Sequence, residues 1–232
     1  MAILDDDFVR ELASRGKQYP RCKWYFTALV ALGAMNYPEE IPDLYRRLLE
    51  SYIAPEEHMS ETRKMREAFT KLCGIQGAAK TGTALRQLSI ATPEELRDPV
   101  RYRENDTDEE AFARGKRFHQ AIYGPNPNYN PTANAVAAPD YNYIVRNYFY
   151  GRIFSFDAIL NDLETSQIIV ACLVGLDCME QLKNHMIGLQ YLGASKDEVE
   201  LIRTIVILIA EKLDIRFKKG NPIPVPDAPR KS

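Results

Sequence analysis

Residues 163–213 constrain the fold of this chain most strongly, because apolar side chains recur there at helical spacing with few breaks. The recurring side chains at the centre of this stretch are Leu182, His185, Leu189 and Leu192. Cys178, Gln181 and His185 lie three, four and seven residues apart. This spacing predicts that a thiol, an amide and an imidazole share the inward-facing side of one helix.

The same spacing limits the chemistry of the thiol and the imidazole. On a straight helix, Cys178 and His185 are roughly 10 Å apart along the axis, so the two side chains cannot touch. Three interpretations remain open. Both residues act on different parts of one pocket with Gln181 between them, only one of them acts, or both are ordinary core residues.

Two segments carry a family resemblance: residues 163–174, LETSQIIVACLV, and residues 181–199, QLKNHMIGLQYLGASKDEV. They resemble the core repeat of the carboxymuconolactone decarboxylase and alkyl hydroperoxide reductase D superfamily. That repeat has an apolar helix, a helix with His, a small residue and Leu-x-x-Gly, and a capped third helix. Residues 114–152, with Ala138-Pro-Asp140 and Tyr150-Gly-Arg152, are similar to fungal-type members.

The chain departs from the peroxidase branch of that superfamily, whose motif is Cys-x-x-Cys-x-x-x-His. Cys178 and His185 fill the first and last positions, and Gln181 replaces the second cysteine. Where the family pattern has an upstream Glu in its proton relay, this chain has Gln167, with Glu164 nearby. The resemblance therefore implies no local dithiol cycle, and acid–base chemistry would depend on His185.

Composition excludes several classes of protein. With 45% hydrophobic residues, 27% charged residues and a net charge of −2, the chain is typical of a soluble globular protein. It offers no general positive field for nucleic acid or an anionic membrane, and its longest apolar run, residues 205–210, is too short to span a bilayer. We expect a small-molecule partner, no nucleic acid and no membrane.

Cofactor and metal motifs are also missing from the sequence. The four cysteines and three histidines have no zinc-site or disulfide-scaffold spacing, which favours a reducing compartment. Residues 77–88 contain glycines and a lysine, but they lack the order of a phosphate-binding loop. We therefore expect no cofactor and no metal.

The ends of the chain bear on its location. Three acids at residues 5–7 argue against a signal peptide, and the ending Pro-Arg-Lys-Ser232 differs from the Ser-Lys-Leu peroxisomal address. We expect an intracellular protein of the cytoplasm or of an organelle such as the mitochondrion or the peroxisome.

Apolar spacing and capping residues predict helices over residues 5–16, 22–35, 43–52, 60–73 and 107–123. Ser60 is expected to cap the fourth of these, and Cys73-Gly74 to end it. The cluster Arg63-Lys64-Arg66 favours a solvated face over an anion site, because Glu61 and Glu67 flank it.

Two Ser/Thr-x-x-Glu sequences suggest an internal duplication. Thr92 to Glu95 and Ser195 to Glu198 both read as capping boxes, and aligning them places Thr81 opposite His185. The first copy would then lack the imidazole.

Residues 125–139 have four prolines and four asparagines, so we expect either a surface insertion or a cover for a pocket. The aromatic residues 140–150 that follow favour core or interface packing, with a pocket wall near His185 as the alternative.

We therefore predict an all-α protein, a helical bundle of two related halves in a single domain over residues 1–232. The degenerate half covers about residues 20–100, the core repeat about residues 140–213, and a Pro-rich tail residues 214–232. Proteins with the core motif commonly assemble, so we expect a homo-oligomer, either a dimer, a trimer or a hexamer.

Three functions remain as alternatives. The first, implied by the resemblance, is a decarboxylase-like small-molecule enzyme, a lyase, in which His185 is the general acid or base on an organic acid or carbonyl substrate. The second is a thiol-dependent antioxidant protein using Cys178, and the third is a binding or structural protein without catalysis. The candidate site residues are His185 and Cys178 for catalysis, and Gln181, Gln167, Tyr148 and Tyr150 for substrate binding.

Overall fold

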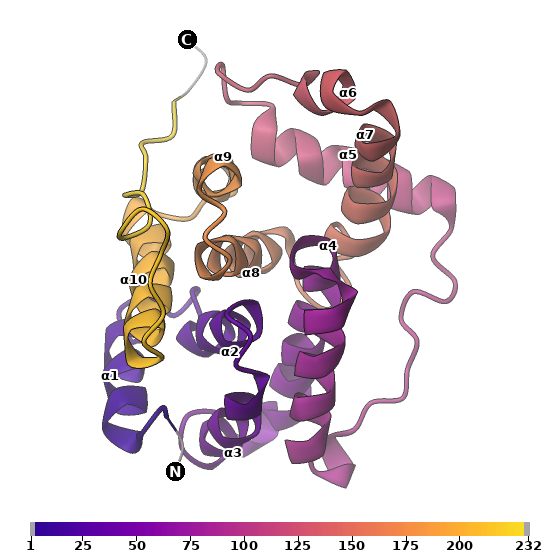
Figure 1. Ribbon diagram of the computed structural model, residues 1–232. Coiled ribbons are helices and arrows are strands. Elements are labelled where there is room, and N and C mark those ends of the chain that lie inside the picture. Colours follow the sequence, from indigo (N-terminus) through magenta and orange to yellow (C-terminus); the bar gives the residue numbers. More distant parts are fainter. Residues whose placement is uncertain (1–2, 230–232) are drawn as a thin grey trace.

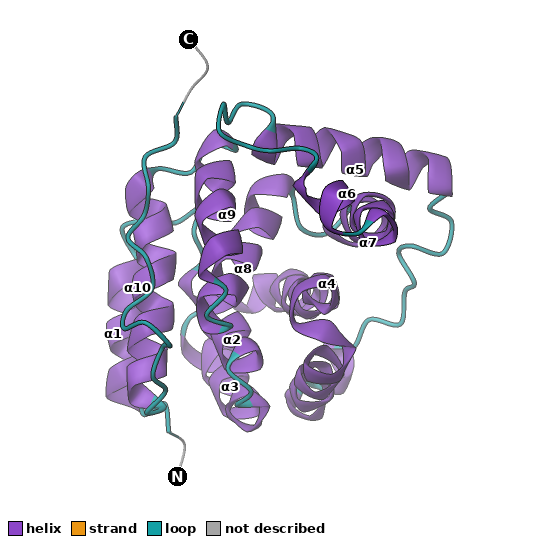
Figure 2. Cartoon of the chain, turned by 45° about the horizontal axis from the view of Figure 1, so that its top comes forward, coloured by secondary structure: helices purple, strands orange, loops and turns teal. Residues whose placement is uncertain are grey.

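A computed structural model describes residues 3–229 and shows an all-α protein, as predicted (Figures 1 and 2). No β-strand occurs within this range. The α-helices are α1 Asp6–Gly16, α2 Trp24–Ala34, α3 Ile41–Ser51, α4 His58–Ala91, α5 Asp108–Tyr123, α6 Ala133–Ala137, α7 Pro139–Ile144, α8 Asp162–Gly175, α9 Met179–Tyr191 and α10 Lys196–Lys212. A π-helical segment, η4 Val145–Phe154, continues α7, and short 3₁₀ turns occupy Pro38–Glu40, Pro55–Glu57 and Glu94–Leu96.

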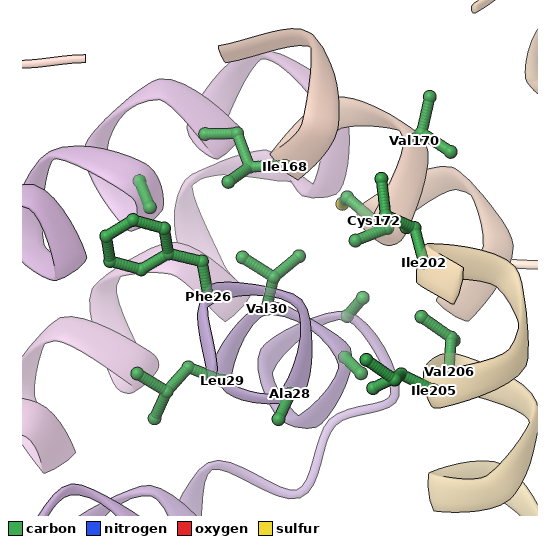
Figure 3. Close-up of a cluster of buried hydrophobic side chains, with 14 of the residues drawn as sticks. Phe26, Ala28, Leu29, Val30, Ile168, Val170, Cys172, Ile202, Ile205 and Val206 are labelled. Carbon is green, nitrogen blue, oxygen red and sulfur yellow. The ribbon is translucent and has the colours of Figure 1, made fainter. Parts of the chain in front are cut away.

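The centre of the molecule is α2, whose residues are all buried. It packs against α8 and α10, and Figure 3 shows side chains of these three helices meeting in one apolar cluster. The labelled members are Phe26, Ala28, Leu29, Val30, Ile168, Val170, Cys172, Ile202, Ile205 and Val206. Full burial of a large apolar side chain contributes about 1.5–3 kcal/mol, so this cluster anchors α8, which leads into the His185 helix.

Side-chain caps begin several helices where the sequence indicates them. Asp5 caps α1 by accepting a hydrogen bond from the backbone N–H of Phe8. Full capping boxes begin α5 at Thr107, α8 at Asn161 and α10 at Ser195. Such a cap is worth about 1 kcal/mol and fixes where each helix begins.

Two local predictions for α4 are wrong. Ser60 lies inside α4, which begins at His58, and its hydroxyl donates to the carbonyl of Glu57. Helix α4 continues through Gly74. The glycine serves close packing there, since the ring of Phe154 would lie 2.8 Å from an added Cβ. The break falls instead at Gly77, whose φ of +84° favours glycine.

The predicted capping box at Thr92 is also absent. The Thr92 hydroxyl donates to the carbonyl of Leu88 at the end of α4, and only the 3₁₀ turn Glu94–Leu96 follows. Thr81, the proposed counterpart of His185, is buried and accepts a hydrogen bond from Gln76. The duplication stays a prediction.

The basic cluster of α4 ties elements together. Arg63 pairs with Asp98, Lys64 pairs with Glu164, and Arg66 donates to the carbonyl of Asp98. These side chains are half-buried and bound within the protein, so the predicted solvated face is wrong; the flanking Glu61 and Glu67 are themselves buried. The three basic side chains connect α4 with α8 and with the loop that leads to α5.

The Pro-rich tail lies along α9 and α10, as Figure 1 shows. Arg203 donates to the carbonyl of Pro222 at 2.7 Å, and Gln190 donates to the carbonyl of Pro226 at 2.9 Å. The last residues of the tail, Arg230 to Ser232, on which the comparison with the peroxisomal address rests, lie outside the described residues.

Helices α5, α6 and α7 and the segment η4 gather on one side of the bundle (Figures 1 and 2). Two close approaches hold this side together. A Cβ added to Gly115 of α5 would lie 2.6 Å from the Cα of Gly151 in η4, and one added to Gly188 of α9 would lie 2.3 Å from Ile122 of α5. Glycine at these positions therefore lets α5 contact both η4 and α9.

Candidate active site

The imidazole of His185 lies on α9 at the junction of these three elements and is 4% exposed. Its Nε2 atom is 3.0 Å from the hydroxyl of Tyr123, the last residue of α5. The Tyr123 hydroxyl lies in turn 2.8 Å from the hydroxyl of Tyr150 in η4. One imidazole and two phenols thus form a hydrogen-bonded row, here called the His–Tyr–Tyr row.

The second ring nitrogen of His185 has no partner. Its Nδ1 atom is buried and forms no hydrogen bond with any group in residues 3–229. Burial lowers the pKa of His185 to about 4, so the ring is neutral at pH 7. An unpaired buried polar atom costs about 1–3 kcal/mol and is a feature typical of sites that bind a ligand or water.

The two phenols stay protonated. Burial raises the pKa of Tyr123 and raises that of Tyr150 well above the ordinary value of 10. At neutral pH the row therefore holds three uncharged groups, each able to donate or accept a proton through its neighbour.

The His–Tyr–Tyr row borders a cavity of about 460 Å³, a volume in the range of small-molecule sites. Its walls come from α4, α5, η4, α8 and α9, and residues of the 125–139 loop cover it. Tyr129 of this loop stacks on Tyr123 with ring centroids 4.4 Å apart. The pocket predicted around His185 is thus present, and the 125–139 loop, expected to be either a surface insertion or a cover, supplies part of its lining.

Two candidate residues lie at the rim of this cavity rather than on an inward-facing stripe. Cys178 precedes α9, because Asp177 has a φ of +58° that separates α8 from α9. Its thiol is exposed, and so is the amide of Gln181 in the first turn of α9. Both side chains still line the cavity. The expectation that they face inward was wrong, although they belong to the same pocket as His185.

Gln167 and Tyr148 lie elsewhere. Gln167 is buried on α8 and donates to the carbonyl of Arg21 at 3.3 Å. Tyr148 is 41% exposed and contacts the rings of Phe112 and Tyr143. Neither side chain lines the cavity, whereas Tyr150 does.

The sequence analysis missed a second imidazole. His119 lies one turn before Tyr123 on α5, lines the cavity and has its Nε2 atom 3.3 Å from the hydroxyl of Tyr129. Arg146 places its Nη1 atom 2.8 Å from Nδ1 of His119 and 2.6 Å from Nε2. Burial, together with the positive charge of Arg146, lowers the pKa of His119 to about 3.

One signal in the sequence points to this arrangement. His119 and Tyr123 are four residues apart, so they share a face of α5 beside the apolar Phe118 and Ile122. Their meeting with Arg146 and His185 depends on tertiary packing, which periodicity does not reveal.

Other cavities of about 550, 610 and 720 Å³ lie near residues 63–117. None of these three is lined by histidine or cysteine, and most of the charged residues around them are engaged in ion pairs such as Arg63–Asp98 and Arg114–Asp106. The smaller cavity at His185 combines two neutral imidazoles, four phenols and a thiol, so it is the candidate active site.

Within residues 3–229, no three His, Cys, Asp or Glu side chains are grouped so that they could hold a metal ion. The helices of this part of the chain include none with the length and apolar character needed to cross a bilayer.

The fold and the cavity define an all-helical protein with a buried histidine–tyrosine site. The chain is 30% identical over 194 residues to Peroxisomal protein 2 of Schizosaccharomyces pombe, covering 84% of this chain and 88% of that protein. It is 26% identical over 266 residues to Peroxisomal protein 2 of Saccharomyces cerevisiae, covering 87% of this chain and 93% of that protein. The chain belongs to the family of these fungal proteins.

No protein-family model matches the chain, and no solved structure matches it either. The relatives' names agree with the prediction of a fungal-type protein and of an organelle as one of its locations. They neither support nor oppose the resemblance to the carboxymuconolactone decarboxylase superfamily, which stays a prediction.

Proposed function

We propose that this protein is a peroxisomal small-molecule enzyme in which His185 performs acid–base chemistry on an organic acid or carbonyl substrate. The observation that carries the proposal is the His–Tyr–Tyr row at the edge of a covered cavity. The location rests on the names of the two yeast relatives.

The protonation states favour His185 as the base. A neutral imidazole accepts a proton at Nε2, and Tyr123 is its hydrogen-bond partner there. A substrate proton that passes to the Tyr123 oxygen releases the phenol proton to His185, so the row moves one proton without an intermediate phenolate. The negative charge that this step leaves on the substrate favours the imidazolium, although burial alone disfavours it.

Tyr150 holds the row in place. Its hydroxyl contacts the Tyr123 hydroxyl, and full burial fixes its ring among the helices. Proton return to the substrate can use the same path in reverse. An isomerase-like reaction needs both of these proton transfers, and a decarboxylase-like reaction needs the second, which delivers a proton to the carbanion left by the loss of CO2; the row therefore supports the first of the three functions.

A second function, a thiol-dependent antioxidant, is favoured by one observation. Cys178 is exposed and lines the same cavity as His185. It lacks a good partner for a disulfide cycle, because Cys172 is fully buried and burial raises the pKa of that thiol. We therefore rank this function below the acid–base reaction.

A screen of small carboxylic acids and lactones tests the proposal, with the wild type beside His185→Ala and His185→Gln. We expect turnover by the wild type and at least about a 100-fold loss in both variants, with helical content retained. Turnover that survives both substitutions but is lost in Cys178→Ser would favour the thiol function. Thermal destabilisation of both variants without any activity in the wild type would favour a structural protein.

A further inference from the structure

Arg146 is an exposed cation without a carboxylate partner; it does not line the cavity itself but contacts His119, which does. It forms no ion pair with any Asp or Glu in the described part of the chain, and its nearest polar contacts are the ring nitrogens of His119. Val145 and Phe149, on either side of it in η4, line the cavity. Most other arginines of this region are paired, as Arg103 is with Glu67 and Arg152 is with Asp108.

The contact with His119 fixes the direction of the charge. A guanidinium only donates hydrogen bonds, so His119 accepts from Arg146 and stays unprotonated. The Tyr129 hydroxyl lies 3.3 Å from Nε2 of His119, the same ring nitrogen that is 2.6 Å from Nη1 of Arg146. His119 therefore orients Arg146 without neutralising it. The positive charge also acts on the cavity wall, because it lowers the pKa of Tyr123, Tyr129 and Tyr150, which burial raises.

We propose that Arg146, oriented by His119, binds a carboxylate group of the ligand and so places the rest of the ligand against Tyr123 and His185. This inference rests on the proposed function, because it assigns the substrate class of the same cavity. Arginine binds carboxylates through paired, charge-assisted hydrogen bonds, which give orientation as well as affinity.

The charge balance favours a carboxylate over a phosphate. Among the described residues no Lys or Arg lines the cavity itself; Arg146 contacts the lining residue His119, and the lining contains the carboxylate of Glu180. A monoanion is compensated by one guanidinium, whereas a phosphate dianion leaves a charge unpaired. Aromatic walls from Tyr129, Phe149 and Phe154 suit the carbon skeleton of an organic acid.

Calorimetric titration of the full chain tests the inference with three probes: benzoate, 4-oxopentanoate and inorganic phosphate. We expect the two carboxylates to bind the wild type. Arg146→Gln should raise their Kd by about 10-fold or more, and Arg146→Lys should give an intermediate Kd. Arg117→Gln is the matched control, because it removes the same charge from an exposed site on α5 that lines a different cavity. Its Kd should equal that of the wild type.

A second readout uses the thiol at the rim. Bound carboxylate should slow alkylation of Cys178 in the wild type and in Arg117→Gln, but not in Arg146→Gln. His185→Gln should keep carboxylate binding. Failure of the proposed reaction would therefore appear as missing turnover with carboxylate binding retained, whereas failure of the carboxylate site would appear as binding that does not depend on Arg146. Equal carboxylate affinity in the wild type and Arg146→Gln, preference for phosphate, or no binding of either carboxylate would each overturn the inference.

Discussion

The Tyr123 hydroxyl lies 3.0 Å from Nε2 of His185, although the two residues are 62 positions apart in the chain. Gly188, one turn after His185, permits this contact, because any Cβ there would collide with Ile122 beside Tyr123. The active-site contact and the packing contact thus join the same two helices, α5 and α9.

Removing the Tyr123 hydroxyl should interrupt proton transfer while leaving the fold intact. Tyr123→Phe keeps the ring that stacks on Tyr129 but removes the partner of His185 Nε2. We expect kcat to fall by about 100-fold and the free energy of unfolding by about 1 kcal/mol. Kinetics on a substrate from the screen and urea unfolding measure the two effects. An unchanged kcat would contradict the role of Tyr123.

The buried imidazoles predict how stability changes with pH. The pKa of His185 is lowered from 6.5 to about 4, and that of His119 to about 3, so the unfolded chain binds these protons first as the pH falls. The free energy of unfolding should therefore decrease between pH 6.5 and pH 4, by on the order of 3 kcal/mol for His185. Urea unfolding across this range should show a smaller decrease in His185→Gln. An identical decrease in both proteins would contradict the assigned pKa.

The cysteines should differ in reactivity. Cys178 is exposed, whereas Cys22 and Cys172 are buried, and burial raises the pKa of Cys22 to about 12. Alkylation of the native protein, followed by mass mapping, should modify Cys178 first. Mild peroxide should give no Cys172–Cys178 disulfide. Such a bridge, cycling with a thiol reductant, would reverse the ranking of the acid–base and antioxidant functions.

Lys71 should be the most sensitive lysine of the fold. Its buried ammonium donates to the carbonyls of Phe154 and Leu160 and to the hydroxyl of Thr165, which joins α4 to the end of η4 and the start of α8. Lys71→Met should lower the free energy of unfolding by about 2–4 kcal/mol, because three buried acceptors lose their donor. Thermal unfolding measures this, with the exposed Lys116→Met as control. Equal stability of the two variants would contradict it.

Apolar periodicity and capping residues were sufficient to predict the helical class. The pocket at His185 was predicted from the cost of burying an unpaired imidazole on an apolar helix face. The start of α10 follows from local chemistry at Ser195, and so does that of α5 at Thr107. Local signals failed at Gly74, where the glycine serves close packing with Phe154 instead of ending a helix.

The site was only partly predictable, because it depends on contacts between distant segments. His185 was identified from its helix, but His119 and Arg146 meet only after α5 and η4 pack through Gly115 and Gly151. Gln167 was chosen by resemblance, and its side chain contacts the carbonyl of Arg21 instead of the cavity. Oligomerisation stays a prediction, which light scattering of the purified chain can test.

The most direct test of the account is proton exchange catalysed by His185. In D₂O, 4-oxopentanoate loses its proton signals next to the ketone when a base removes these protons, and NMR follows the loss. We expect the wild type to accelerate this exchange over buffer and His185→Gln to be slower by about 100-fold or more, while both bind the ligand. Bound ligand that exchanges no faster than in buffer, or equally fast with both proteins, would contradict the role of His185 as the acid–base residue.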